Sequence, residues 1–328
     1  MTTYPTRSLG RNGPQVPAIG FGAMSIGGAY GTPLAEVEEK LQVLDHAHAI
    51  GSRFWDTADV YGDCEDRMGD WFKHSGKRDD IFLATKFGLK YEANFQQSEH
   101  SDYDYVKSAC EKSLSRLGVD VIDLYYCHRI DGKTPIEETV RAMAELKNEG
   151  KIRFLGLSEV SAATIRRAHA VHPISAYQIE YSPFSLDIES EKLGILKTCR
   201  ELGITIVAYS PMGRGLLTGQ IKSYDDLDPT DHRRMFPRFS EANFPKIMAL
   251  VDRFRAVADQ HDCSVSQVCL SWILAQGDDI IPIPGTQKTK YLDLNHGAAN
   301  IQLTADELVE LRHAAEQTEV LGDRYPAT

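Results

Sequence analysis

Four polar side chains stand at or just beyond the ends of short apolar runs. Asp56 ends one run, and Tyr61 follows it in the adjoining loop. Lys86 ends the next run, and His128 comes two residues after a third. If these runs are neighbouring parallel strands, their carboxyl ends bring all four side chains to one rim. Each residue alone also has an ordinary explanation, such as a helix-capping aspartate or a solvated lysine.

Together these four groups could form a proton-donating device. A tyrosine hydroxyl titrates near 10 in water, which is too high for easy proton transfer at neutral pH. An ammonium about 4 Å away stabilises the phenolate by roughly 4 kcal/mol at an effective dielectric of 20. A carboxylate partner offsets the cost of burying that ammonium. A neutral imidazole can orient a carbonyl oxygen, so the set predicts a general acid poised over a carbonyl.

The elements that must position these groups alternate along the chain. Short apolar runs, typical of buried parallel strands, are separated by longer amphipathic segments typical of helices. The eight runs are Ala18–Phe21, Arg53–Asp56, Ile81–Lys86, Ile122–Tyr126, Phe154–Leu157, Tyr177–Glu180, Ile204–Tyr209 and Ile280–Ile283. This alternation predicts the α/β class.

Several local signals mark where the expected helices begin and end. Capping boxes start at Thr134, Ser264 and Thr304, each with Glu or Gln three residues later. Glycines at positions where a left-handed residue would end a helix precede the next apolar run. These glycines are Gly51, Gly150 and Gly203.

Two architectures compete for this alternation, an open doubly wound sheet and a closed barrel. A nucleotide-binding open sheet should show GxGxxG after its first strand, and the glycines at Gly20 and Gly22 fail that spacing. Eight strand–helix units fit a (β/α)8 TIM barrel, which we predict as a single domain over residues 1–328. The surplus residues should form an N-terminal hairpin around Gly10–Gly13, a long segment Gly213–Ser240 and extra helices near the C-terminus.

Composition excludes several classes of protein. The 328 residues carry a formal net charge of −11 and are 42% apolar, which argues against a disordered chain and against a nucleic-acid partner. No stretch approaches the roughly 20 apolar residues needed to span a bilayer, and no signal-peptide core is visible. Six cysteines without a CxxC pair favour reduced thiols and a cytoplasmic protein. The pair His46 and His48 falls inside an expected helix, where side chains two apart diverge, so no metal site is predicted.

Asp56, Tyr61, Lys86 and His128 lie within sequence motifs that resemble those of a known family. Asp56-Thr-Ala-Asp-Val-Tyr-Gly62, Ala84-Thr-Lys86 and Asp123-Leu-Tyr-Tyr-Cys-His128 resemble motifs of the aldo-keto reductase superfamily, as do three later segments. The later segments are Gly156-Leu-Ser-Glu159, Gln178-Ile-Glu-Tyr-Ser182 and Ala208-Tyr-Ser-Pro211. The resemblance implies a barrel that binds a nicotinamide cofactor without a Rossmann fold, with Asp56, Tyr61, Lys86 and His128 as the catalytic tetrad. Tyr61 would donate the proton on reduction, assisted by Lys86 and Asp56, and His128 would position the carbonyl.

The resemblance also implies a set of cofactor-binding residues. Ser158 and Gln178 match positions that bond the nicotinamide amide, and Tyr209 matches the aromatic residue that stacks on its ring. The remaining matches are Ser210, Met212 and Gly213 at the pyrophosphate, Gly285 and Thr286 in a phosphate-binding turn, Asn295 at the adenine, and Gly22 and Met24 beside the nicotinamide ribose and the pocket, with Asp56 shared with the tetrad.

Two departures from the family pattern bear on this set. Glu159 stands where the family often has asparagine, and Gln287 where it often has arginine. A fork of donors suits the 2′-phosphate of NADP better than glutamine does. Lys288 could supply the missing charge, so we predict NADP(H), with NAD(H) as the weaker cofactor.

The resemblance leaves the substrate open. The stretches Gly156–Ser161, Ala168–Pro173 and Glu180–Ser185 are most similar to pyridoxal-reductase-like members. The expected activity is reversible reduction of an aldehyde or ketone to the alcohol, with a small-molecule carbonyl substrate and no obligate protein partner. The alternative is a slow-turnover cofactor-sensing protein that resembles potassium-channel β subunits.

Overall fold

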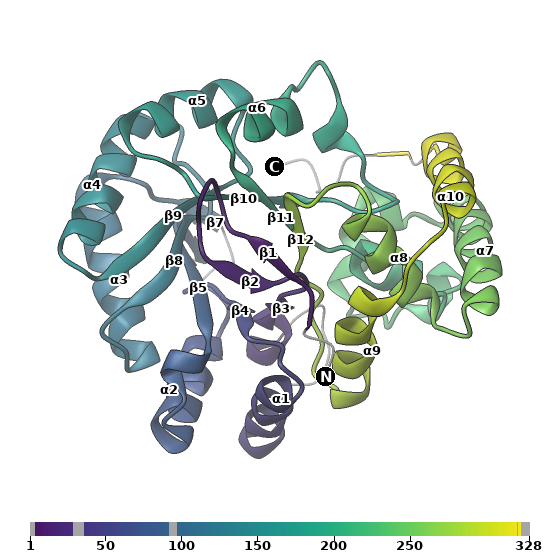
Figure 1. The fold of residues 1–328 in the computed structure, drawn as a ribbon, viewed down its shortest axis with the longest axis horizontal. Helices are drawn as coiled ribbons and strands as arrows, with labels where there is room; N and C mark the ends of the chain where they lie inside the picture. The colour runs from purple at the N-terminus through teal and green to yellow at the C-terminus, as the bar shows by residue number, and fades with distance from the viewer. Residues whose placement is uncertain (1–3, 29–35, 92–96, 320, 323–328) are drawn as a thin grey trace.

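Eight parallel strands form one curved sheet in the computed structural model, which describes residues 4–28, 36–91, 97–319 and 321–322. Along the sheet the strands follow the order β3, β4, β5, β8, β9, β10, β11 and β12. Their bounds are Phe21–Gly22, Phe54–Asp56, Phe82–Phe87, Ile122–Cys127, Ile152–Ser158, Ala176–Glu180, Thr205–Tyr209 and Ile280–Pro282. Each overlaps one of the eight predicted apolar runs, and Figure 1 shows helices along the outside of the sheet.

Backbone hydrogen bonds close this sheet into a barrel. The Gly20 N–H donates to the Pro282 carbonyl at 3.0 Å, and the Gly22 N–H donates to the Pro284 carbonyl at 3.1 Å. These bonds join the chain around β3 to the chain around β12, the two edges of the sheet. A Cβ at Gly22 would lie 2.5 Å from the Ile283 carbonyl oxygen, so the close approach requires glycine there. The predicted (β/α)8 architecture is confirmed.

An N-terminal hairpin covers the end of the barrel at which the strands start. Strand β1 (Thr6–Ser8) pairs antiparallel with β2 (Gln15–Pro17), as the sequence predicted. Thr205, the first residue of β11, accepts from the Gly10 N–H at 2.7 Å and donates to the Ser8 carbonyl at 2.9 Å. Apolar side chains of the hairpin and of the strands form one buried cluster, which comprises Leu9, Val16, Phe54, Ala84, Leu124, Tyr126, Ala176, Val207, Ile281 and Ile283. The interior of the barrel is therefore packed at this end.

Ten α-helices lie within the described residues. Their bounds are Val37–Ala49 (α1), Cys64–Ser75 (α2), Tyr103–Leu117 (α3), Ile136–Asn148 (α4), Ala162–Val171 (α5), Ile195–Leu202 (α6), Phe244–Gln260 (α7), Val265–Leu274 (α8), Thr289–Gly297 (α9) and Ala305–Gln317 (α10). Their buried apolar faces pack on the outer face of the strands in a second, larger core. The predicted helix-ending glycines Gly51, Gly150 and Gly203 have φ of +86°, +78° and +71°, the left-handed conformation expected.

Two of the three predicted capping boxes are formed. Ser264 and Gln267 cap α8, and Thr304 and Glu307 cap α10. The box at Thr134 was wrong, because α4 starts at Ile136 and the Thr134 hydroxyl donates instead to Asp131 Oδ2 at 2.7 Å.

The surplus residues form the additional elements that the sequence suggested. Helices α7 and α10 lie side by side at the edge of the molecule (Figure 1). The segment from Gly213 to Ser240 contains four short 3₁₀ turns rather than long helices. A second hairpin, β6 (Leu89–Tyr91) with β7 (Gln97–Glu99), was not predicted. Among the described helices, none is long and apolar enough to cross a membrane.

Candidate active site

An ion pair at the carboxyl ends of β4 and β5 forms the centre of the site. Lys86 Nζ lies 2.5 Å from Asp56 Oδ1 and donates to the Thr57 carbonyl at 2.7 Å. The lysine is fully buried and the aspartate is 2% exposed. The other Asp56 oxygen, Oδ2, accepts a hydrogen bond from Gln178 Nε2 at 2.7 Å. The carboxylate therefore pairs with the lysine cation through one oxygen and binds a neutral amide through the other. Such compensation makes a buried lysine tolerable.

Tyr61 is brought against this lysine by the loop between β4 and α2. Lys86 Nζ lies 4.9 Å from the centre of the Tyr61 ring. The loop folds back on itself, since the Tyr61 N–H donates to the Ala58 carbonyl at 3.1 Å. Gly27 packs on the loop so closely that a Cβ there would lie 1.9 Å from the Tyr61 carbonyl oxygen. Tyr61 is half-buried, which leaves part of the side chain accessible at the rim.

His128 completes the group from the end of β8. Its ring meets the Tyr61 ring edge-on, with centres 5.8 Å apart and planes at 87°. Its backbone N–H donates to the Phe87 carbonyl at 2.8 Å, which ties the residue to β5. Within the described residues, the buried His128 Nδ1 has no hydrogen-bond partner. The structure thus brings together all four residues that the sequence predicted as one constellation.

Burial shapes the protonation of the site. Burial lowers the pKa of His128 well below its usual range, and the charges of Lys86 and Arg129 act in the same direction. The imidazole is therefore neutral at neutral pH. Burial also raises the pKa of Asp56, while the charge of Lys86 and the amide of Gln178 oppose that rise. The 2.5 Å contact between Lys86 Nζ and Asp56 Oδ1 is an ion pair, because a neutral carboxyl would leave the buried ammonium uncompensated.

Residues predicted to hold the nicotinamide lie on the neighbouring strands. Ser158 ends β9 and is buried, and Arg129 Nη1 donates to its hydroxyl at 3.3 Å. Gln178 lies in β10, with its amide nitrogen on Asp56 and its amide oxygen still able to accept. Tyr209 ends β11 and its hydroxyl donates to Glu159 Oε1 at 2.9 Å.

Residues predicted to hold the phosphates follow β11 and β12. Ser210 and Gly213 have φ of +49° and +55°, so the chain turns sharply at Ser210–Gly213, and Met212 lies within this turn. Gly285 lies against Gly22, such that a Cβ there would stand 2.6 Å from the Gly22 carbonyl oxygen. Thr286 accepts from the Lys288 N–H at 3.0 Å through its hydroxyl.

The start of α9 offers a suitable place for a phosphate group. Lys288 is the N-cap residue of α9 and is exposed, and Lys290 follows it. The first N–H groups of a helix and nearby cations both favour anions. Asn295 lies further along α9 and is 4% exposed, while Met24 lies on the 3₁₀ turn after β3. The chemistry of these donors, which lie between β9 and α9, fits a phosphate-bearing dinucleotide.

The comparison with known families agrees with this geometry. Residues 18–316 match the Aldo/keto reductase family. The chain belongs to this family.

Similar proteins support the assignment along nearly the whole chain. Aldo-keto reductase str7 of Strobilurus tenacellus is 56% identical, covering 98% of this chain and 94% of that protein. Aldo-keto reductase yakc [NADP(+)] of Schizosaccharomyces pombe is 49% identical, covering 99% and 95%. Among solved structures, the glycerol dehydrogenase AKR11B4 from Gluconobacter oxydans aligns with a TM-score of 0.86 at 28% identity, covering 95% of each chain. The thermostable aldo-keto reductase Tm1743 aligns with a TM-score of 0.76 at 28% identity, covering 94% of this chain and 99% of that one.

The two departures from the family pattern have distinct surroundings in this aldo/keto reductase. Glu159 has φ of +52°, and its carboxylate accepts from the Tyr209 hydroxyl. Gln287 turns back into the protein, where its amide donates to the Ser25 carbonyl. Gln287 is therefore directed away from solvent, and the exposed Lys288 is the cation nearest in sequence to the Gly285 turn.

The sequence did not predict one neighbour of the site, Arg129. Arg129 follows His128 directly and contacts Ser158, but a lone arginine after a strand carries no distinctive signal.

The histidines of the His46-Ala-His48 motif bond different partners, Asp293 and Asp80, as expected for diverging side chains.

Proposed function

We propose that this chain reduces an aldehyde or ketone to the alcohol with NADPH, in a reversible reaction. The observation that carries this proposal is the placement of Lys86 Nζ, 2.5 Å from Asp56 and 4.9 Å from the Tyr61 ring centre, beside a neutral His128. Membership of the aldo/keto reductase family supports the same chemistry.

Each of these residues has a role that follows from its surroundings. Tyr61 would donate its phenolic proton to the carbonyl oxygen as reduction proceeds. Lys86 stabilises the resulting phenolate by its positive charge, and Asp56 holds that charge in place. His128, neutral and fixed to β5, would direct the carbonyl oxygen toward the phenol. A bound nicotinamide supplies the hydride for the carbonyl carbon.

The rim residues would hold the cofactor. Ser158 and the amide oxygen of Gln178 can bond a carboxamide, and the ring of Tyr209 can lie against the nicotinamide. The turn at Ser210–Gly213 and the turn at Gly285 would contact the phosphates. Lys288 at the start of α9 would meet the 2′-phosphate of NADP, the cofactor that appears in the name of the S. pombe relative.

The substrate is proposed at the level of chemical class. The Gly156–Ser161, Ala168–Pro173 and Glu180–Ser185 stretches support a pyridoxal-like aromatic aldehyde as the first compound to test. The structural neighbour named glycerol dehydrogenase supports adding polyols in the oxidation direction.

The decisive experiment is a steady-state assay with NADPH and a panel of aldehydes and ketones that includes pyridoxal. We expect many turnovers per protein molecule with at least one aldehyde. Turnover limited to the amount of bound cofactor would instead favour the cofactor-sensing alternative. No change in NADPH fluorescence on mixing with the protein would contradict cofactor binding altogether.

A further inference from the structure

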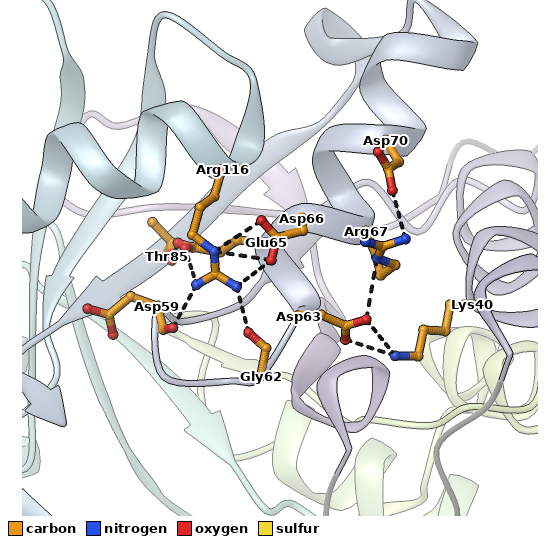
Figure 2. Close-up of polar contacts among 10 residues, drawn as sticks. All are labelled: Lys40, Asp59, Gly62, Asp63, Glu65, Asp66, Arg67, Asp70, Thr85 and Arg116. Carbon is orange, nitrogen blue, oxygen red and sulfur yellow. Dashed lines mark hydrogen bonds and ion pairs between the residues drawn. The ribbon is translucent and has the colours of Figure 1, made fainter. Parts of the chain in front are cut away.

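Arg116 on α3 forms hydrogen bonds to Asp59 and Gly62, which belong to the loop that carries Tyr61 (Figure 2). Its Nη1 donates to the Asp59 carbonyl at 2.9 Å, and its Nη2 donates to the Gly62 carbonyl at 2.5 Å. These two carbonyl groups flank Tyr61 in the sequence. One planar guanidinium thus holds the backbone on both sides of the tyrosine.

The same guanidinium also binds two carboxylates at the start of α2, and its Nε donates to both Asp66 carboxylate oxygens at 3.2 Å. Nη1 also donates to Glu65 Oε2 at 3.0 Å, and Nη2 donates to Asp66 Oδ2 at 2.7 Å. Glu65 is fully buried, and its other oxygen accepts from the Thr85 hydroxyl at 2.7 Å. Thr85 directly precedes Lys86 in β5. One network therefore links the strand that carries the lysine to the loop that carries the tyrosine.

Backbone hydrogen bonds to β5 hold the beginning of this loop, and Arg116 contacts the part that follows. The Asp59 N–H donates to the Lys86 carbonyl at 3.0 Å, which fixes the chain at that point. The chain then turns through Gly62, whose φ is +53°, before α2 begins at Cys64. Arg116 then bonds the backbone carbonyls on each side of Tyr61.

We propose that Arg116 is a positioning residue that places the Tyr61 phenol at its working distance from Lys86 and so sets the rate of proton transfer. This inference rests on the proposed reductase function. A lysine cannot replace the arginine, because a single ammonium nitrogen cannot reproduce a planar fork with three separate nitrogens. Arg116→Lys should keep the positive charge near Glu65 and lose the two-sided grip.

Arg78 provides a matched control at the opposite end of the barrel. It also bonds two carbonyls and a carboxylate, those of Ile81, Val121 and Asp123, at 2.7 Å each. Its side chain is 20% exposed, against 17% for Arg116. Arg78→Lys therefore removes a comparable pair of carbonyl contacts where strands β5 and β8 start, away from the rim.

The first test compares the two variants in steady state. We expect Arg116→Lys to lower kcat at least tenfold with KM for NADPH within twofold of wild type, and to enlarge the solvent deuterium isotope effect on kcat. Arg78→Lys should lose stability but keep kcat within twofold. In Arg116→Ala, guanidinium chloride at non-denaturing concentration should restore turnover, whereas sodium chloride at the same concentration should not. Equal losses of kcat in the two lysine variants would overturn the proposal.

A second test does not depend on activity. With 3-fluorotyrosine placed at position 61, the fluorine resonance should shift or broaden in Arg116→Lys and stay unchanged in Arg78→Lys. An unchanged resonance in Arg116→Lys would overturn the placement role even if wild type proved to be an active reductase. An inactive wild type would instead contradict the proposed function, and the fluorine signal would still decide where Arg116 puts Tyr61.

Discussion

At the scale of single residues, the site depends on how a fully buried lysine keeps its charge. Removing one partner of a buried ion pair typically destabilises a protein by about 3–5 kcal/mol, because the other charge stays uncompensated. The charge of Lys86 is compensated by Asp56 Oδ1, and the lysine also donates to the Thr57 carbonyl. Gln178 donates to the second Asp56 oxygen. The lysine is thereby held as a fixed cation beside Tyr61 instead of moving to solvent.

The first residue-scale prediction concerns Tyr61→Phe. Without its hydroxyl the proposed acid has no proton to give, so we expect kcat to fall at least about a hundredfold, equivalent to roughly 2.7 kcal/mol of barrier. NADPH affinity, measured by fluorescence titration, should change little. Tyr125→Phe is the control, since Tyr125 is fully buried on the outer side of β8 and its hydroxyl lacks a partner within the described residues. Retention of wild-type kcat by Tyr61→Phe would remove the residue from the mechanism.

The second residue-scale prediction concerns Lys288→Ala. Charge-assisted hydrogen bonds contribute about 1.5–3 kcal/mol, so loss of a 2′-phosphate contact should raise Kd for NADPH by roughly tenfold or more. Kd for NADH, which lacks that phosphate, should stay within twofold and serves as the internal control. Both constants come from fluorescence titration at fixed ionic strength. An unchanged NADPH/NADH preference would show that another residue recognises the phosphate.

At the scale of elements, the strands were predictable because each is short, apolar and buried on both faces. Alternation between such runs and amphipathic helices identified all eight barrel strands. The first strand is displaced, however, because Phe21–Gly22 pairs with β4 while the residues before it bond to the chain near Pro282. The hairpin of β6 and β7 was missed because its residues are largely polar and exposed.

The candidate site was predictable to the extent that strand ends determine it. Asp56 ends β4, Lys86 is the second-last residue of β5 and His128 follows β8, so their convergence followed from the barrel itself. The Arg116 network was not predictable in the same way. Its contacts with the Asp59 and Gly62 carbonyls join residues 57 and 54 positions apart through the backbone, which leaves no pattern in the sequence. The Thr134 box failed for a related reason, since Asp131 competes for the threonine hydroxyl.

Strands β9 and β8 pack closely where Gly156 faces the Tyr126 ring. A Cβ added at Gly156 would lie 2.3 Å from Cδ1 of the Tyr126 ring, which itself packs 5.9 Å from Lys86 Nζ. Gly156→Ala should therefore lower the free energy of unfolding by about 1–3 kcal/mol, measured by denaturant titration. If the ring causes the loss, combining it with Tyr126→Leu should cost less than the sum of the two single changes. Strict additivity would contradict the proposed clash.

The two ends of the barrel differ in what they contain: packing and backbone contacts close one end, and the candidate site lies at the other. The end where strands start is closed by the N-terminal hairpin and by carbonyl contacts from Arg7 and Arg78. The other end carries the ionisable residues of the site. The net charge of −11 leaves an excess of carboxylates over cations, and their mutual repulsion lowers the overall stability.

The buried carboxyl of Asp59 should make the free energy of unfolding depend on pH. Burial and the nearby charge of Glu65 raise the pKa of Asp59 to about 7, while Lys112 and Arg116 oppose the rise. A carboxyl whose pKa is higher in the folded state binds a proton more tightly there. Its contribution to stability is therefore full below its ordinary pKa near 4 and is lost as the pH rises to about 7.

Asp59→Asn should remove this loss. At pH 8 we expect the variant to unfold with a free energy about 1–4 kcal/mol higher than wild type. The difference should shrink toward pH 4, where Asp59 is protonated in the folded protein and about half protonated in the unfolded chain. Urea titrations from pH 4 to pH 8 measure both curves. Asp225→Asn, a change of the same kind at an exposed position, should leave the wild-type pH dependence in place. A variant that gained nothing between pH 4 and pH 8 would show that the Asp59 carboxyl is ionised in the folded protein without cost.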